Sequence, residues 1–175
     1  MKLIKPTQRI AVITVIALSL MGFAVSSFGA SDSKKSEFNQ TIKVTHGKVD
    51  ATNSQRIDLG TAGPSIGDLQ IFYIPLTSSQ GGYLTGTLTV TASNQPSAGI
   101  EVRIAAFTFS IGSQSDQILV GGSAVYDTTS PTVSIGVKTI RPVIGGSGKY
   151  SGARGWAESI QSADGTWTHT FRITR

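Results

Sequence analysis

Three sets of residues in this chain have types and spacings found at catalytic or ligand-binding sites, and the first is a glycine-rich segment. Gly148-Lys149 resembles the end of a phosphate-binding loop, in which backbone N–H groups and a lysine contact phosphate. Such a loop needs Gly five residues before its Gly-Lys pair and Ser or Thr after it. This chain has Val143 and Tyr150 at those places. We therefore reject nucleotide binding, and the glycines need another explanation.

The second set is an acid and a base on one strand face. Glu101 and Arg103 lie two residues apart, and the alternation of a strand places them on the same face as Phe107 and Phe109. The pair either points into the fold as an acid with its charge partner, or forms a solvated pair near the start of a strand. We favour the solvated pair, which would contribute little to stability.

The third set is the two histidines, His46 and His169, which both lie on faces of alternating apolar residues. His169 is a candidate general acid or base, and the alternative is a hydrogen-bonded, partly buried histidine. The chain has no cysteine and no paired carboxylates at ligand spacing, so we expect no metal site and no cofactor. It also lacks the Gly-x-Ser-x-Gly motif of serine hydrolases.

The N-terminus has the three-part layout of a secretory signal peptide. Lys2, Lys5 and Arg9 precede an uncharged, mostly apolar run over residues 10–25, and small residues follow at 26, 27 and 29–31. The run is short for a spanning helix and a polar segment follows it, so we favour cleavage over a permanent anchor. We predict a signal peptide at residues 1–30, a flexible arm at 31–40 and one folded domain at 41–175. The mature protein is expected to be secreted or periplasmic, with no membrane span.

Charge and composition restrict the partners of this domain. Loss of the three basic residues of the leader leaves 12 Lys and Arg against 10 Asp and Glu, a net charge of about +2. No basic stripe with interleaved aromatic residues is present, so we expect no nucleic-acid partner. A domain of this size without disulfides must be held together by a buried core.

The segments that position these residues have the period of two that is typical of half-buried strands. Residues 69–76 are apolar on both faces and are expected to be covered on both. Turns rich in Gly, Pro, Asn and Ser separate the segments, so the fold is an antiparallel barrel or sandwich, and glycines within strands favour a barrel. The predicted strands are residues 41–47, 69–76, 83–92, 100–110, 117–126, 132–140, 156–161 and 166–174, with at most a short one at 56–59.

The glycine segment resembles a signature of the allene oxide cyclase and dirigent superfamily. It reads Ile144-Gly-Gly-Ser-Gly-Lys-Tyr-Ser-Gly-Ala-Arg-Gly-Trp156, and Gly67-Asp-Leu69 with Phe72, Tyr126-Asp127 and His169-Thr-Phe-Arg-Ile173 are similar to further family segments. The resemblance covers residues 66–175. It implies an eight-stranded antiparallel β-barrel with a central apolar cavity, commonly assembled as a homotrimer. In this interpretation the glycines form a corner of the barrel, and Arg154 holds it through backbone hydrogen bonds.

The resemblance also implies a function. Allene oxide cyclases and dirigent proteins act by holding a reactive molecule in one conformation, away from water. The cyclases' first-strand glutamate and Ser-Pro pair are absent from residues 41–55, so we do not transfer their reaction. We predict an exported barrel that binds a small apolar ligand, and any enzymatic activity would be that of a cyclase or isomerase. The alternative is a non-catalytic ligand-binding or structural envelope protein.

The alignment at Gly67-Asp-Leu69 assigns residues to the cavity. It turns Gln70, Phe72 and Ile74 inward, and apolar or aromatic residues of later strands are candidates for the same cavity. For each of them the alternative is a plain core residue, and a turn-end tyrosine can instead bond to backbone. The predicted ligand-binding residues are Gln70, Phe72, Ile74, Leu88, Phe107, Phe109 and Tyr126.

Overall fold

A computed structural model describes residues 38–175, and the predicted signal peptide and most of the predicted arm lie outside them. Within this range no helix is long and apolar enough to cross a membrane. The described elements are β1 (Gln40–His46), β2 (Ser54–Ile57), β3 (Leu69–Pro75), β4 (Gly82–Ser93), β5 (Ile100–Ile111), β6 (Gln117–Val120), β7 (Ser123–Asp127), β8 (Thr139–Gly146), the 3-10 turn η1 (Gly148–Tyr150), β9 (Arg154–Gln161) and β10 (Trp167–Thr174).

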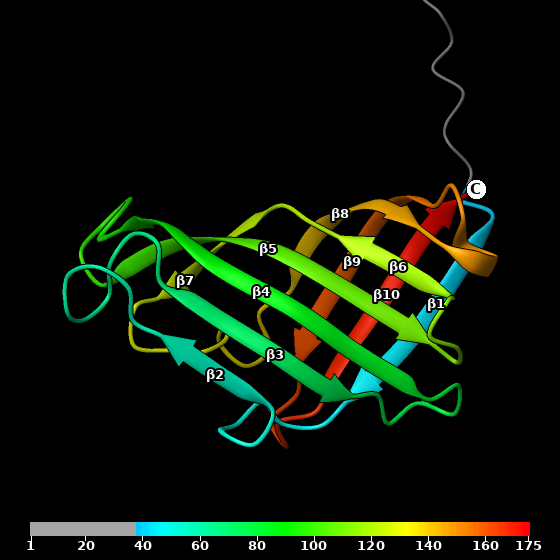
Figure 1. Cartoon of the computed structure of the whole chain (residues 1–175), viewed down its shortest axis with the longest axis horizontal. Helices are drawn as coiled ribbons and strands as arrows, with labels where there is room; N and C mark the ends of the chain where they lie inside the picture. Colours follow the sequence, from blue (N-terminus) through cyan, green and yellow to red (C-terminus); the bar gives the residue numbers. More distant parts are fainter. Residues whose placement is uncertain (1–37) are drawn as a thin grey trace, which may run out of the picture. The chain divides into compact units, whose positions relative to one another are not determined.

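These strands form one antiparallel sheet that curls into a barrel, as predicted (Figure 1). The strand order is β1-β10-β9-β8-β6-β5-β4-β3-β2, and β7 also pairs with β5. The predicted strand at 117–126 is split, because β6 and β7 pair with successive parts of β5 on either side of Gly121-Gly122. The split and the short edge strand β2 account for ten strands where eight were expected.

The sheet closes on itself at a short seam between β1, one edge strand, and the end of β3, the strand beside the other edge strand β2. His46 forms a single β-bridge with Leu76, and the Thr77 N–H donates to the Thr45 carbonyl at 2.7 Å. In Figure 1 the ends of these two strands lie together at the lower edge of the sheet. Pro75 ends β3, as expected of a residue without an N–H to donate.

The predicted strand at 132–140 is wrong. Residues 128–138 form a loop, and the strand of this region, β8, begins only at Thr139. Pro131 has no N–H for a ladder, Gly136 has a φ of +77°, and the Val137 N–H bonds to the Ser134 carbonyl in a turn. The shift places Arg141, which lies outside every predicted strand, near the start of β8 in the barrel wall.

The expectation that residues 69–76 are covered on both faces is also wrong. Gln70, Phe72 and Ile74 are buried, but the outward-facing Ile71 and Tyr73 are 39% and 59% exposed. The strand lies in an antiparallel sheet that is covered on one side only. Tyr73 packs instead along the surface, against the ring of Tyr83 at a centroid distance of 5.4 Å.

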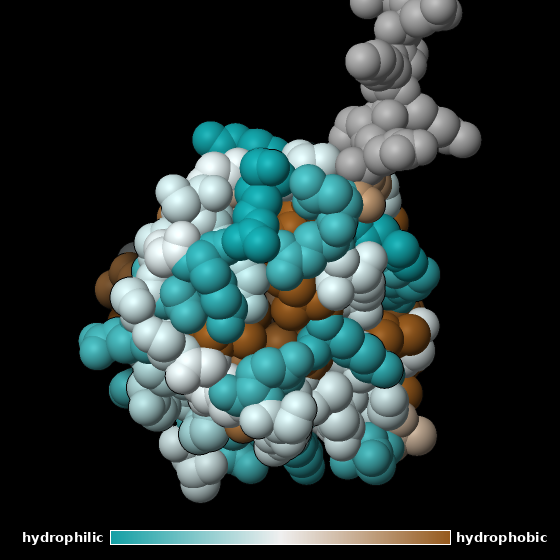
Figure 2. Space-filling view, turned by 90° about the vertical axis from the view of Figure 1, so that its right-hand side faces the viewer, coloured by the Kyte–Doolittle hydropathy of each residue, from teal (hydrophilic) through white to brown (hydrophobic). Residues whose placement is uncertain are grey.

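Inward-facing side chains fill the end of the barrel at which β5 and β10 finish. Ile111, Ile118, Phe171 and Ile173 are completely buried there. Figure 2 views this end, where hydrophobic residues occupy the centre of the face inside a frame of hydrophilic ones. Space for a ligand is therefore to be found toward the opposite end.

The glycine segment forms the corner between β8 and β9, with η1 at its tip. A Cβ on Gly146 would lie 2.3 Å from the Tyr150 carbonyl oxygen, so only glycine fits beside this turn. Arg154 donates to the adjacent Ala153 carbonyl at 2.7 Å. The segment is thus part of the barrel framework and lies apart from the cavity described below.

Candidate ligand cavity

A cavity of about 50 Å³ lies between the sheet and the loop at residues 128–138, and it is partly open to solvent. The ends of β1 and β7 and the starts of β8 and β10 surround it, together with the middle of β3, β4 and β5. A volume of this size holds a few water molecules as it stands. A larger ligand requires lining side chains or the loop to move.

One wall of the cavity is apolar and comes from three adjacent strands. Phe72 and Ile74 extend from β3, Leu84 and Leu88 from β4, and Phe107 from β5. The rings of Phe72 and Phe107 meet edge to face with centroids 5.8 Å apart, an arrangement that aromatic pairs prefer. This wall offers an apolar surface to a ligand in the cavity.

The facing wall carries a buried guanidinium group. Arg141, on β8, is only 5% exposed. Its Nη1 donates to Thr139 Oγ1 at 3.0 Å, and its Nη2 donates to Tyr126 Oη at 2.5 Å. Since Tyr126 accepts this bond, its own hydroxyl hydrogen is free to donate. Burial raises the pKa of Tyr126, against the opposing effect of Arg141 and Arg103, so the phenol is neutral.

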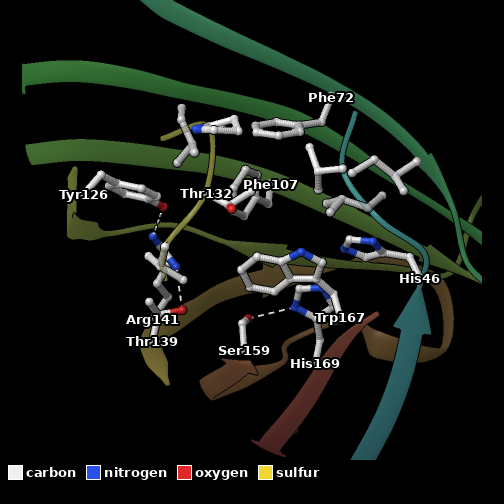
Figure 3. A pocket seen from close by; sticks show the side chains of 16 residues that line it. His46, Phe72, Phe107, Tyr126, Thr132, Thr139, Arg141, Ser159, Trp167 and His169 are labelled. Carbon is white, nitrogen blue, oxygen red and sulfur yellow. Dashed lines mark hydrogen bonds between the residues drawn. The ribbon is translucent and has the colours of Figure 1, made fainter. Parts of the chain in front are cut away.

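The remaining wall is a stack of three rings at the start of β10 and the end of β1. Trp167 and His169 lie nearly parallel with centroids 6.0 Å apart, and His46 stacks on His169 at 5.0 Å. Figure 3 shows Arg141, Tyr126 and Thr139 on one side of the cavity, His46 on the other, and Trp167 in the region between them.

Burial determines the protonation of the two histidines. It lowers the pKa of His46, despite the bond between its Nδ1 and the Gly47 carbonyl oxygen at 2.7 Å. Burial lowers the pKa of His169 well below its usual range, and the nearby His46 and Arg141 lower it further. His169 Nδ1 is 2.7 Å from Ser159 Oγ. Both imidazoles are therefore neutral near pH 7.

Three buried nitrogen atoms of cavity residues have no hydrogen-bond partner within the described chain. They are Arg141 Nε, Trp167 Nε1 and His169 Nε2. Arginine Nε and tryptophan Nε1 can only donate, whereas the role of His169 Nε2 depends on its tautomer. Unsatisfied polar atoms are rare in protein interiors, and their grouping around one cavity makes it the candidate site.

A second buried cluster holds the loop that forms one side of the cavity. The Arg103 side chain, 2% exposed, pairs through Nε with Glu101 and donates to the carbonyls of Ser130 at 2.7 Å and Pro131 at 3.1 Å. The favoured prediction of a solvated pair is wrong, because Glu101 and Arg103 lie on the inward face of β5 under this loop. Pro131 and Thr132, which the pair helps to place, contact the cavity.

The structure brings five of the seven predicted ligand-binding residues together, namely Phe72, Ile74, Leu88, Phe107 and Tyr126. Phe109 lies deeper, 4.8 Å from the ring of His169. Gln70 is buried outside the cavity and bonds to Ser54 Oγ at 2.7 Å. That the five bind a ligand remains a prediction.

Sequence reasoning missed Arg141, Trp167 and Thr139 as cavity residues. Trp167 was detectable, because the alternation along β10 places it on the same face as His169. Thr139 was assigned to the end of a misplaced strand, and Arg141 lies between that strand and the glycine segment, where no strand was predicted. Among residues 38–175 no group of His, Cys, Asp or Glu has the geometry of a metal site, and no carboxylate lines the cavity.

Comparison with known proteins supports the fold. The sequence matches no protein-family profile and no curated protein. A pyocyanin demethylase superposes with a TM-score of 0.58 at 18% identity, over 77% of this chain and 100% of the other. The exo-specific intermolecular Diels-Alderase AbnU gives 0.50 at 16%, over 77% and 98%. A pterocarpan synthase dirigent protein gives 0.50 at 13%, over 77% and 84%. All three are similar barrel-like folds, and at these identities the likeness concerns the fold alone.

Proposed function

We propose that this barrel binds a small, largely apolar molecule in the cavity between Phe72, Phe107 and Arg141, and that any catalysis occurs by holding that molecule in one conformation. The observation that carries the proposal is the grouping of three unpaired buried nitrogens opposite an aromatic wall. Apolar pockets with a few oriented polar groups are the usual form of small-molecule sites.

The reaction class we propose is that of a cyclase or isomerase. No carboxylate lines the cavity within the described chain, and the means of catalysis that we propose are shape, exclusion of water and hydrogen bonds to an oxygen of the substrate. Neutral His169, with a free Nε2, is placed to exchange a proton with a bound molecule. The resemblance of the glycine segment to allene oxide cyclases and dirigent proteins supports the same class.

One observation favours a second function, that of a structural envelope protein. The cavity volume of about 50 Å³ is small beside pockets that enclose drug-sized ligands, which measure hundreds of cubic ångströms. If the loop at residues 128–138 does not move, the barrel is nearly filled by its own side chains. Ligand binding and this alternative then differ in one measurable property, the response of stability to small molecules.

The test compares ligand responses of the mature chain and two loop variants. Thermal unfolding is measured across a panel of small aromatic and alicyclic compounds, together with native mass spectrometry after incubation with an envelope extract. Thr132→Phe fills the cavity from the loop, whereas Ser134→Phe changes an exposed residue of the same loop. We expect stabilisation of the unaltered chain and of Ser134→Phe only. If no compound raises the unfolding temperature and no small molecule stays bound in native mass spectrometry, ligand binding is contradicted and the structural function remains.

Location and assembly complete the proposal. We propose that the chain is exported after cleavage within residues 27–31 and assembles as a homotrimer, as the family resemblance implies. The outward-facing Tyr73, Val125 and Ile140 are each more than half exposed, which supplies apolar surface for such contacts. Light scattering of the mature protein is expected to give the mass of three chains. A monomer would contradict the assembly and leave the cavity proposal untouched.

A further inference from the structure

The charge of Arg141 has no counterpart within the described chain. An arginine stays protonated inside proteins, so its buried guanidinium group carries a full positive charge. No carboxylate of the described residues lies within 4.0 Å of it, whereas Arg103, another buried arginine, is paired with Glu101. The partners of Arg141 are two neutral hydroxyl groups, of Thr139 and Tyr126. An unpaired buried charge is strongly unfavourable.

The groups beside Arg141 would also favour a negative charge in the cavity. The Tyr126 hydroxyl accepts from Arg141 and can therefore donate its hydrogen to a third atom. Arg141 Nε and Trp167 Nε1 are further donors that find no acceptor in the part of the chain that the structure describes. No acidic side chain faces these donors from the cavity lining. A ligand oxygen with negative charge would satisfy several donors at once.

The opposite side of the cavity defines the rest of the ligand. Phe72 and Phe107 offer ring edges and faces, and the indole of Trp167 adds a flat surface. The guanidinium carbon of Arg141 is 5.8 Å from the Phe107 ring centroid, so the charge lies directly beside the aromatic wall. A flat hydrocarbon group attached to the anion would pack against these rings.

We infer that the natural ligand is a small aromatic or conjugated anion whose carboxylate or phenolate oxygen binds the guanidinium group of Arg141 and the Tyr126 hydroxyl. This inference rests on the proposed function and narrows its ligand class from apolar molecules in general to acids. The same contacts would stabilise a negative charge that develops on a substrate oxygen during isomerisation.

The experiment measures the affinity of the mature chain for matched probes by calorimetry. Sodium benzoate and benzyl alcohol share a ring and differ in charge, and ionised 4-nitrophenol distinguishes phenolate from carboxylate recognition. We expect the favoured anion to bind at least about tenfold more tightly than the alcohol, the ratio typical of one charge-assisted contact. In Arg141→Met this ratio is expected to fall to about one. Arg154→Met, which alters an exposed arginine on β9, is expected to keep it.

Each outcome decides a different point. Equal binding of benzoate, 4-nitrophenolate and benzyl alcohol would overturn the inference and leave the proposed function in place. A preference for the anion that persists in Arg141→Met would also overturn it. Failure of all three probes to bind would count against the proposed function itself. If Arg141→Met does not fold, the unaltered chain and Tyr126→Phe still test the inference, because the ratio of anion affinity to alcohol affinity is measured within one protein. We expect this ratio to be lower in Tyr126→Phe than in the unaltered chain.

Discussion

Arg141 is the residue whose environment is hardest to explain by folding alone. It lies in a barrel wall among Val143, Ala157 and Tyr126, where an apolar side chain would be expected, and it has no carboxylate partner in the described chain. Replacement of buried charged groups by apolar ones of similar volume is often neutral or stabilising. A charge that costs stability and is nevertheless present points to a role in binding.

This view predicts the stability of Arg141→Met without ligand. Methionine keeps the unbranched stem and removes the charge, while the bonds to Thr139 and Tyr126 are lost. We expect the free energy of unfolding to be unchanged or to rise by about 1 kcal/mol. Urea unfolding measures it, with exposed Arg154→Met as the control. A loss of more than about 2 kcal/mol would show that Arg141 is a structural residue.

The sequence predicted the apolar wall of the cavity and Tyr126 but missed Arg141, for a physical reason. Alternation along a strand places Phe72 and Ile74, or Leu88 and Val90, on one face without knowledge of any partner strand. Arg141 enters the cavity because β8 pairs with β9 and β6 in a particular register. Such register depends on contacts far apart in the sequence, which no local pattern contains.

At the scale of elements, the loop at residues 128–138 depends on one buried ion pair. Arg103 bonds to carbonyls of Ser130 and Pro131, and Glu101 compensates its charge. The pair thus connects the inner face of β5 to the wall of the cavity. Glu101 Oε2 has no hydrogen-bond partner among residues 38–175, so the pair is not fully satisfied and its role is better described as positioning than as stabilising.

We predict that removal of one member of this pair is worse than removal of both. Glu101→Leu leaves Arg103 buried and unpaired and is expected to cost about 3–5 kcal/mol of unfolding free energy. The double variant Glu101→Leu with Arg103→Met should recover much of that loss, yet release the loop carbonyls. Urea unfolding and limited proteolysis at residues 128–138 measure the two effects. A double variant as unstable as the single one would refute the positioning role.

The glycine corner gives a second prediction for an element. Gly155 on β9 has a φ of +142°, and a Cβ there would lie 2.0 Å from the Arg172 carbonyl oxygen of the neighbouring strand. Gly155→Val should therefore cost more than about 3 kcal/mol or prevent folding. Gly152 has a φ of +80° but open space around it, so Gly152→Val carries backbone strain alone, about 1–2 kcal/mol. Circular dichroism of the two variants measures whether they fold, and urea unfolding measures their free energies of unfolding. A stable Gly155→Val variant would contradict this geometry.

The wrong prediction of a strand at residues 132–140 shows a limit of predicting strands from local sequence. Residues 132–137 read Thr-Val-Ser-Ile-Gly-Val, with the alternation of a strand, and their apolar members include Ile135 and Val137. Both are more than 45% exposed in the structure. Their position follows from the bonds of Arg103 to the preceding carbonyls, a long-range contact that outweighs local strand propensity.

For the whole molecule, the two histidines and Asp68 couple folding to pH. Burial opposes ionisation of Asp68, but N–H groups of Leu59 and Ser65 and the guanidinium group of Arg56 bind it and lower its pKa to about 2. It contributes stability above its unfolded pKa of about 3.8, and this contribution is lost as pH falls toward 2. The histidines act in a separate window at higher pH.

His46 and His169 are the chain's two histidines, and their folded pKa values lie below the model-peptide value of 6.5. Above that pH both histidines are neutral in the folded and unfolded states, so they do not change the free energy of unfolding as pH varies. Below that pH the two imidazoles bind protons in the unfolded chain but remain neutral in the folded chain, because burial lowers their pKa values. The free energy of unfolding should then fall with decreasing pH, by up to about 1.4 kcal/mol per pH unit for each histidine.

We therefore predict a loss of stability on acidification below about pH 6.5, before the window in which Asp68 titrates. In His169→Gln the slope of the unfolding free energy against pH should become shallower between about pH 6 and 5, because one of the two histidines that the unfolded chain protonates is gone. Urea unfolding at a series of pH values measures the slope, and the value near pH 8 reports the packing cost of the substitution separately. An unchanged slope would mean that His169 is protonated in the folded barrel, and hence that a neutral imidazole is not what the cavity presents to a ligand.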